Sequence, residues 1–468
     1  MDSACRLVVI GGGCAGFSAA LEAAEAGADV ILLEKLANTG GSSAICGGAL
    51  AFAGTDLQRN NGIEDSDELL FKDLREVGQF ENDEIIVRTY VQNQLATYHW
   101  LRKHGVEFSP VVEASAGQSV PRWHAVDPAD MVRSLQAHCL ASGKVRLMTS
   151  TRAQRLLRNQ SSGRVEAVLA EKDGVQFKVS GSDGIILASG GFSRNPELLH
   201  RFAPGFEQAI PLGGEGNVGD GLRMAWQLGA DFRDMCYIKG TYGKHPIDTS
   251  TVHPLLAVYK GAIAVNQEGK RYVDESLSYK LLGDACMRQT HSSTYQIFDQ
   301  DIFESGENRI RILDIERRLE MGLLMKAPSL EKLAQMIEVP VATLLETVAR
   351  YNGFVTNGFD ADFGRKCLVH HHGKLRRIER APFYVYPSAV MLNATYCGLC
   401  IDSEMRVLDV FGDPIEGLFA AGEVVGGLHG AAYVTGSALG KAAIFGRLAT
   451  RTALARSESA VQHARPEA

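Results

Sequence analysis

The chain has 468 residues, of which 45% are hydrophobic and 22% are charged, so it is long enough for two or three globular domains. Its net charge of -7 excludes the basic surface that binds nucleic acids or anionic membranes. No apolar run reaches the roughly 18 to 20 residues that span a bilayer, and no secretory signal pattern is seen, so we expect a cytoplasmic protein without a transmembrane segment.

The first predicted element is a buried strand over Leu7–Ile10, and Gly11, Gly13 and Gly16 follow it in GxGxxG spacing. The first two glycines allow a tight turn and let backbone N–H groups approach a pyrophosphate. The third lets a helix, predicted over 14–26, pack against the strand. The unpaired N–H groups and the dipole at the start of this helix favour an anion.

A second buried strand, Val30–Leu33, ends in Glu34, where an acid would bond the ribose hydroxyls of an adenosine. Strand, turn, helix and acid together indicate a dinucleotide-binding unit, whereas a glycine-rich turn alone would not. Small residues crowd the next stretch, 38–48, and permit a flat ring or a phosphate to lie against the backbone. A flexible linker is the alternative, which the apolar run 49–53 disfavours.

Strands and helices alternate through the middle of the chain until the composition changes near Asp234. Helices are predicted across 65–103 and 219–228, strands across 145–157, 164–170 and 184–188, and a loop across 109–127. Beyond Asp234, a hairpin at 263–273 and two helices within 329–354, separated by Pro340, indicate an inserted second domain. The last helix is predicted to begin near Ser437, and a polar tail begins at Arg456.

Nine cysteines are scattered along the chain, an odd number that is typical of free thiols in a reducing compartment. Cys397 and Cys400 have CxxC spacing, but the sequence has no second pair to complete a zinc site. The histidines at 370–372 also lack spaced acidic or thiol partners. We expect no metal site.

Five separated stretches carry a family pattern: 8–35, 38–49, 261–276, 329–365 and 417–449. Through them the chain resembles the flavoprotein superfamily of fumarate reductase and succinate dehydrogenase, which also holds the 3-ketosteroid dehydrogenases. The resemblance implies an α/β fold, with a Rossmann-like FAD-binding domain of the glutathione-reductase type and an inserted α+β capping domain. The FAD-binding domain would comprise 1–233 and 393–455, the cap 234–392, and a disordered tail 456–468.

The same resemblance implies FAD bound without a covalent link and extended across the nucleotide domain, with a mobile cap over its ring. The residues carried over fall into groups along the cofactor. They are Gly11, Gly13 and Gly16 at the pyrophosphate, Glu34 at the adenosine ribose, Ser42, Ser43, Gly47 and Gly48 along the flavin, Asp220 and Glu423 near the ribityl chain, and Ser437 and Leu439 at the ring end, with Ala15, Lys35 and Gly41 completing the set. The helix from Ser437 would point its N-terminus at the pyrimidine edge, favouring the negative charge of reduced flavin.

Two arginines of the fumarate reductases are replaced here. The proton-donating arginine aligns with Tyr279, and the arginine that clamps the substrate carboxylate aligns with the segment that runs from His429 into Tyr433. A desolvated dicarboxylate without cationic partners would cost several kcal/mol, so we expect a neutral substrate. Tyr279 and the run from Tyr433 to Thr435 instead resemble the 3-ketosteroid dehydrogenases, most closely the Δ4-(5α) type. Thr241 aligns best with the family's His-Pro-Thr segment.

Removing hydrogen next to a ketone needs a base for the α-proton, an electrophile for the enolate oxygen and a hydride acceptor. We expect Tyr433 to be the base, supported by Thr435, and Tyr279 to be the electrophile, or the two tyrosines to exchange roles. Flavin N5 would accept the hydride, and in reverse the same groups would reduce an enone. The substrate would be a neutral ketone or enone, and the electron donor or acceptor is not identified.

Two alternatives remain open. One is reduction of an unsaturated carboxylic acid in the manner of fumarate reductases, and the other is a non-enzymatic flavin-binding protein. Without the alignment, each tyrosine would be interpreted as a core aromatic with a satisfied hydroxyl.

Overall fold

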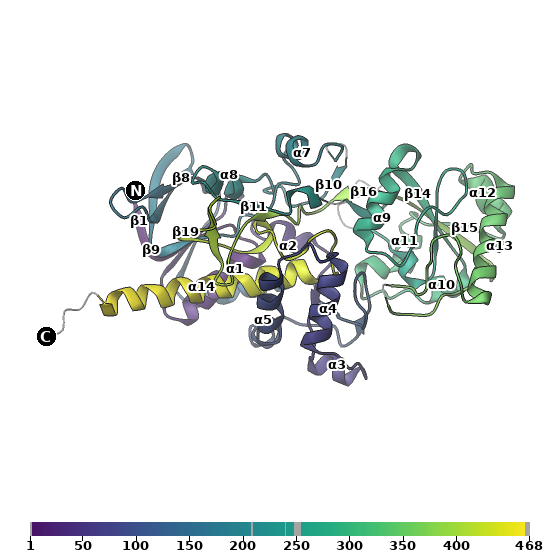
Figure 1. Cartoon of the computed structure of the whole chain (residues 1–468), viewed down its shortest axis with the longest axis horizontal. Coiled ribbons are helices and arrows are strands. Elements are labelled where there is room, and N and C mark those ends of the chain that lie inside the picture. The colour runs from purple at the N-terminus through teal and green to yellow at the C-terminus, as the bar shows by residue number, and fades with distance from the viewer. Residues whose placement is uncertain (1, 207–208, 239, 248–253, 370, 464–468) are drawn as a thin grey trace.

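A computed structural model describes residues 2–206, 209–238, 240–247, 254–369 and 371–463. Two sheets lie toward opposite ends of the molecule, and the long C-terminal helix runs beneath the first of them (Figure 1). The α/β fold class is confirmed.

The first sheet is the nucleotide-binding sheet, with strand order β18-β19-β9-β1-β2-β6 and the β7–β8 pair attached to β9. β1 is parallel to both β2 and β9, and β6 and β19 extend the sheet in parallel on its two sides. The strands are β1 Ser3–Ile10, β2 Val30–Leu33, β6 Val145–Met148, β7 Arg152–Arg158, β8 Val165–Lys172, β9 Val175–Leu187, β18 Arg406–Leu408 and β19 Pro414–Ala420. All four residues of β2 are buried, as expected for a parallel strand covered on both faces.

Helices α1 and α14 pack together under this sheet (Figure 1). The helices of this half are α1 Cys14–Glu25, α2 Gly41–Ile45, α3 Asp56–Asn60, α4 Asp67–Val77, α5 Glu84–Lys103, α6 Pro128–Ala141, α7 Pro196–Phe202, α8 Asp220–Trp226 and α14 Ser437–His463. Several begin at a side chain that accepts backbone N–H groups, such as Ser66 before α4 and Asp83 before α5. These caps explain why the predicted helical stretch 65–103 divides into two helices.

The second sheet is built around β16, which pairs with β10, β12, β14 and β15, while β13 pairs with β14. Its strands are β10 Ile210–Pro211, β12 Thr241–Lys244, β13 Ile263–Val265, β14 Ser293–Phe298, β15 Met325–Ala327 and β16 Phe383–Leu392. Its helices are α9 Tyr279–Met287, α10 Gln300–Glu304, α11 Ile315–Glu320, α12 Leu330–Met336 and α13 Val341–Asn357. A hydrophobic cluster separate from that of the first sheet lies here, so this half has its own core.

The structure differs from the sequence predictions at several short elements. The predicted loop 109–127 contains β4 Val112–Glu113 and β5 Trp123–Ala125, which join β3 Ala49–Ala51 in a small sheet. Strands of two or three residues are too short to show a periodic pattern. The predicted strand 145–157 is broken between β6 and β7, where Ser150 has a φ of 51°. The remaining short pair is β11 Phe232–Arg233 with β17 Gly398–Leu399.

The predicted break at Pro340 is confirmed, since α12 ends before it and α13 begins after it. The predicted hairpin 263–273 is reduced to a single bridge, between Val265 and Arg271, because β13 pairs with β14 instead. Helix α14 continues to His463, so the chain is helical past the predicted start of the tail at Arg456.

The division at residues 234 and 392 stays a prediction, although β10, which precedes 234, already belongs to the second sheet. Across the ranges that the structure describes, no helix combines the length and the apolar character needed to cross a bilayer.

Candidate active site

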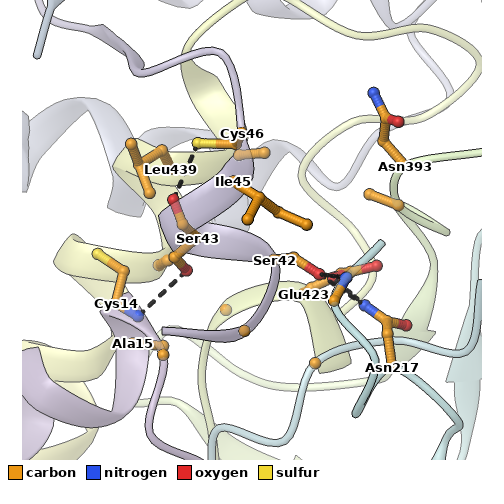
Figure 2. Close-up of a pocket in the computed structure, with 18 of the residues that line it drawn as sticks. Cys14, Ala15, Ser42, Ser43, Ile45, Cys46, Asn217, Asn393, Glu423 and Leu439 are labelled. Carbon is orange, nitrogen blue, oxygen red and sulfur yellow. Dashed lines mark hydrogen bonds between the residues drawn. The ribbon is translucent and has the colours of Figure 1, made fainter. Parts of the chain in front are cut away.

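The main cavity begins at the carboxyl ends of β1 and β2 and extends to the second sheet. Its lining includes the β1–α1 turn, the end of β2, helix α2, the first turns of α14, and parts of β12 and α9. Figure 2 shows α2 between the α1 turn and Glu423, with Ser42 and Ser43 directed to opposite sides. In open parallel sheets, ligands bind at this edge.

The β1–α1 turn is closely packed. Gly11 has a φ of +113°, and a Cβ there would lie 2.3 Å from the carbonyl oxygen of Ala188. A Cβ on Gly16 would lie only 1.8 Å from the carbonyl oxygen of Gly11, so this third glycine allows helix packing, as predicted. Gly13 and Ala15 line the cavity at the start of α1, where the helix terminus favours a phosphate. The Cys14 N–H donates to Ser43 Oγ at 3.1 Å, which ties α2 to this turn (Figure 2).

Glu34 lies in the cavity at the end of β2, where the sequence places it. Its two carboxylate oxygens accept the N–H groups of Gly12 and Leu36, both at 2.9 Å, so its orientation is fixed. Lys35 donates to Asp220 at 2.7 Å, and Arg152 donates to the other oxygen of the same carboxylate at 2.8 Å. Asp220 is therefore tied to the segment that follows Glu34 and lines the cavity, as Glu423 also does. The predicted place of these two acids near the ribityl chain stays a prediction.

Glu423 belongs to a polar cluster beside α2. Asn217 Nδ2 donates to Glu423 at 2.7 Å and to Ser42 Oγ at 3.1 Å (Figure 2). Burial raises the pKa of Glu423, and bonds from the Thr395 N–H and Asn217, with the charge of Lys441, act in the opposite direction. Asn217 was not predicted from the sequence, because it lies in a loop without a periodic pattern.

The residues predicted to lie along the flavin and at its ring end divide into two groups. Some line the cavity, and others have a structural role. Gly41, Gly47 and Leu439 line the cavity, but Gly48 and Ser437 do not. Gly48 has a φ of +70°, and a Cβ there would lie 2.2 Å from a backbone oxygen of residue 126, so its role is a tight turn. Ser437 is fully buried and donates to the Val434 carbonyl at 2.6 Å.

These features together fit a dinucleotide cofactor of the FAD type. The glycine turn has no room for side chains, so its backbone can approach a pyrophosphate. Glu34, at the end of β2, lies where an acid binds the ribose of a dinucleotide. The N-terminal turns of α1 and α14 both line the cavity. When bound, FAD supplies hydride transfer at its flavin ring.

Beyond α2, the cavity wall becomes aromatic. Tyr433 lies between Tyr396, Tyr279 and His429, with ring centroids 4.9, 5.6 and 5.4 Å away. All four side chains are at least nine-tenths buried and line the cavity. The structure thus brings together the two predicted tyrosines, one from α9 and one from the loop before α14, and adds Tyr396 and His429.

Hydroxyl groups gather around Tyr433. Ser115 donates to Thr435 Oγ1 at 3.2 Å, and the rings of Tyr279 and Tyr433 lie with their centroids 5.6 Å apart. The Tyr433 oxygen also accepts the Gly436 N–H at 3.0 Å. The support of Tyr433 by Thr435 stays a prediction, and the Thr435 hydroxyl also acts to lower the pKa of Tyr279.

Burial sets the acidity of these groups. It raises the pKa of Tyr433 to about 12, and the bonds from Gly436 and Tyr279 act against that rise. Burial raises the pKa of Tyr279 still further above its usual value, together with the neighbouring phenols of Tyr433 and Tyr396. Because more donors point at its oxygen, Tyr433 is the phenol that loses its proton first.

The loop 115–118 and the start of α9 hold these side chains in place. Gln118 Nε2 donates to the Thr435 carbonyl at 2.8 Å, and Ser278 Oγ donates to the Tyr433 carbonyl at 3.1 Å. Ser278 also caps α9 by accepting the N–H of Lys280. Ser278 therefore joins the start of α9, which carries Tyr279, to the backbone at Tyr433.

His429 is a neutral imidazole in this cluster. Burial lowers its pKa well below the usual value, and the nearby charges of Lys441 and Lys280 lower it further. Nδ1 lies 3.4 Å from Ser437 Oγ, whereas Nε2 has no hydrogen-bond partner among the described residues.

Two basic residues close to the cavity were not predicted. Lys280 is fully buried, with Nζ 4.2 Å from the ring centroid of Tyr396 and a short hydrogen bond to Thr241 Oγ1. Arg311 lines both the main cavity and a neighbouring one, and its Nη1 donates to the Cys46 carbonyl at 3.1 Å. Neither residue belongs to a sequence motif, so only the tertiary structure shows that they lie at the cavity.

In the part of the chain that the structure covers, no group of three or more His, Cys, Asp or Glu side chains could hold a metal ion. Cys397 and Cys400 flank β17 as free thiols, and His370 lies outside the described residues.

Comparisons with known proteins agree with this site. A family model described as an FAD binding domain matches residues 6–439. The fumarate reductase (cytochrome) of Shewanella frigidimarina is 33% identical over 467 residues, covering 97% of this chain and 77% of the relative. The vinyl phenol reductase of Lactiplantibacillus plantarum is 30% identical, covering 89% of each chain.

Among solved structures, the 3-ketosteroid-Δ4-(5α)-dehydrogenase of Rhodococcus jostii RHA1, in complex with 4-androstene-3,17-dione, superposes with a TM-score of 0.77 at 25% identity, covering 96% of this chain and 97% of that one. The family match covers most of the chain, including the glycine turn, Glu34 and the start of α14. The chain therefore belongs to the FAD-binding flavoprotein family of fumarate reductase and succinate dehydrogenase, and it is an FAD-dependent oxidoreductase.

Proposed function

We propose that the enzyme transfers hydride between FAD and a carbon–carbon bond next to the carbonyl of a neutral ketone, in the manner of a 3-ketosteroid dehydrogenase. The observation that carries the proposal is the buried phenol of Tyr433, whose oxygen accepts the Gly436 N–H, in a segment that resembles the one where fumarate reductases keep an arginine. Phenols exchange protons with a neutral ketone, whereas they offer no charge to a dicarboxylate.

The names of two relatives support a neutral substrate. One relative is named a vinyl phenol reductase and one structural neighbour a ketosteroid dehydrogenase, and neither name implies a dicarboxylate. The cavity wall near the tyrosines also carries apolar groups, among them Trp123, Leu256 and Ile312. Such a wall suits a ring better than an acid.

The chain's own residues would act as follows. Tyr433 takes the α-proton of the saturated ketone, and the Gly436 N–H and Tyr279 stabilise the phenolate that this requires. FAD, which the β1–α1 turn, Glu34 and the start of α14 would hold, would supply the acceptor for the hydride of the β-carbon, so that the double bond could form. Buried walls exclude water from the reacting carbons. In the reverse direction, Tyr433 returns the proton to the α-carbon of the enone.

The direction of reaction should determine its pH dependence. Dehydrogenation needs the phenolate of Tyr433, and because burial raises the pKa of that phenol to about 12, the phenolate fraction grows about tenfold per pH unit below it. We expect kcat/KM for dehydrogenation to rise with a slope near one between about pH 8 and 10. Enone reduction needs the phenol and should not rise.

Initial rates in both directions, measured anaerobically with an artificial electron carrier, check this expectation. The Tyr433→Phe variant should lose the slope. If kcat/KM depended on pH in the same way in both directions, the base would be another residue. The same would follow if the rise of kcat/KM with pH persisted in Tyr433→Phe.

Reduction of an α,β-unsaturated carboxylic acid is the second candidate, and Arg311 favours it. Its guanidinium lines the cavity, and within the described residues no carboxylate forms an ion pair with it. A guanidinium in this state can hold a carboxylate. The curated relatives named fumarate reductase point the same way.

The variant Arg311→Gln separates the two candidates. If acids are the substrates, KM for an unsaturated acid should rise about 10- to 100-fold while KM for its methyl ester stays unchanged. If ketones are the substrates, KM for cyclic ketones should change less than about threefold. Arg309→Gln is the matched control, since Arg309 lines only the neighbouring cavity and pairs with Glu307.

A further inference from the structure

Tyr279 cannot serve as the electrophile while it supports the base. A phenol has one O–H, and in the proposed mechanism Tyr279 donates it to the Tyr433 phenolate. The enolate oxygen formed during dehydrogenation still needs a hydrogen-bond donor, because an uncompensated oxyanion in a buried cavity is costly. The donor must come from another part of the cavity wall.

Thr241 is a hydroxyl donor on the cavity wall. It lies on β12, lines the cavity, and is only 5% exposed. Its Oγ1 accepts a short hydrogen bond from the Lys280 ammonium. Because the lone pairs of the oxygen are engaged by a cation, the hydroxyl proton is polarised and is available to an acceptor in the cavity.

Lys280 is held where it can exert this effect. Its neighbour Tyr279 begins α9, and its own N–H is capped by Ser278, so the side chain leaves the first turn of a fixed helix. Nζ lies over the ring of Tyr396, 4.2 Å from the centroid, which favours the charged form. The lysine does not itself line the cavity, so it reaches a ligand only through Thr241.

We propose that Thr241 is the oxyanion-binding residue of this site and that Lys280 is the positioning residue that polarises it. The inference rests on the proposed function, because it supplies the electrophile that ketone chemistry requires. The substrate class that follows is a ketone whose oxygen lies against Thr241 while its α-carbon faces Tyr433.

The charge on Lys280 depends on its surroundings. Burial lowers its pKa to about 7, and the carboxylates of Asp284 on α9 and Glu423 beside α2 act against this. The other titratable or polar groups that face it are Tyr279 on α9, Thr241 on β12, Tyr396 on the segment after β16 and His429 on the loop before α14. The polarising effect should therefore be strongest below about pH 7. Above it the neutral amine still donates a weaker hydrogen bond to Thr241, so dehydrogenation can still rise between pH 8 and 10.

Binding of an acidic fluorinated phenol to the FAD-loaded enzyme tests the proposal without turnover. The phenolate mimics an enolate, and its 19F chemical shift reports ionisation in the site. We expect Lys280→Met and Thr241→Val to raise the apparent pKa of the bound phenol by about 1 to 2 units. Thr241→Ser keeps the hydroxyl and should behave as the parent enzyme.

Lys326→Met is the control, because Lys326 also lies over a tyrosine ring, that of Tyr384, but outside the cavity. Ionisation of the bound phenol that is the same in Lys280→Met, Thr241→Val and the parent would overturn the proposal, as would an enzyme that binds no phenol. Ionisation that depends on Lys280 in an enzyme that turns over no ketone would support this inference and reject the proposed function. An enzyme that turns over ketones, but in which Lys280→Met leaves the ionisation of the bound phenol unchanged, would support the proposed function and reject this inference.

Discussion

Replacing Tyr433 by phenylalanine should lower kcat for ketone dehydrogenation by about 100- to 10,000-fold, the usual contribution of a general base. The ring would stay packed among its aromatic neighbours, and only the oxygen that accepts the Gly436 N–H would be lost. Affinity for FAD should therefore remain within about twofold. Stopped-flow measurement of flavin reduction by substrate, beside a titration of the apoprotein with FAD, gives both quantities.

Tyr384→Phe is the matched control. Tyr384 is a buried tyrosine of the second sheet whose hydroxyl donates to Gln300 at 2.6 Å, and it does not line the cavity. It should retain full activity. A Tyr433→Phe enzyme as fast as the Tyr384→Phe enzyme would remove Tyr433 from the mechanism.

Replacing Gly16 by alanine should abolish FAD binding. The added Cβ would lie 1.8 Å from the Gly11 carbonyl oxygen, so α1 must move away from the turn that approaches the pyrophosphate. Overpacking of this kind costs about 1 to 3 kcal/mol or more, and the displaced turn also loses its N–H contacts to the cofactor. We expect the dissociation constant for FAD to rise at least about 100-fold.

The matched substitution is Gly353→Ala, in the middle of α13, where a Cβ meets nothing within 4 Å. That variant should bind FAD normally and gain slightly in thermal stability, because alanine favours a helix. Circular dichroism of both apoproteins separates a misfolded chain from a folded one with a damaged turn. A Gly16→Ala protein that is yellow and saturated with FAD would show that FAD binding does not require a glycine at position 16.

The nucleotide-binding unit could be predicted because its signals are local. Strand β1, the glycine turn, helix α1 and Glu34 follow one another within a short segment, and each has its own pattern. The α12–α13 break at Pro340 was predictable for the same reason, since proline removes a donor wherever it stands.

The polar groups of the reaction site could not be predicted in the same way. Lys280 is one residue from Tyr279, yet nothing in the sequence tells that its ammonium meets Thr241, because that contact joins a helix to a distant strand. The hydrogen bond from Ser115 to Thr435 likewise joins residues that are 320 positions apart. A resemblance could align the tyrosines, but only tertiary structure shows that their rings pack together.

The most direct test of the account is an anaerobic experiment on the FAD-loaded enzyme after its flavin has been reduced. Cyclic enones, 3-ketosteroids among them, and fumarate are mixed separately with the reduced enzyme, and the return of the oxidised flavin absorbance is followed. We expect rapid reoxidation by at least one cyclic enone, none by fumarate, and loss of the enone reaction in Tyr433→Phe. Rapid reoxidation by fumarate, with no response to any enone, would contradict it.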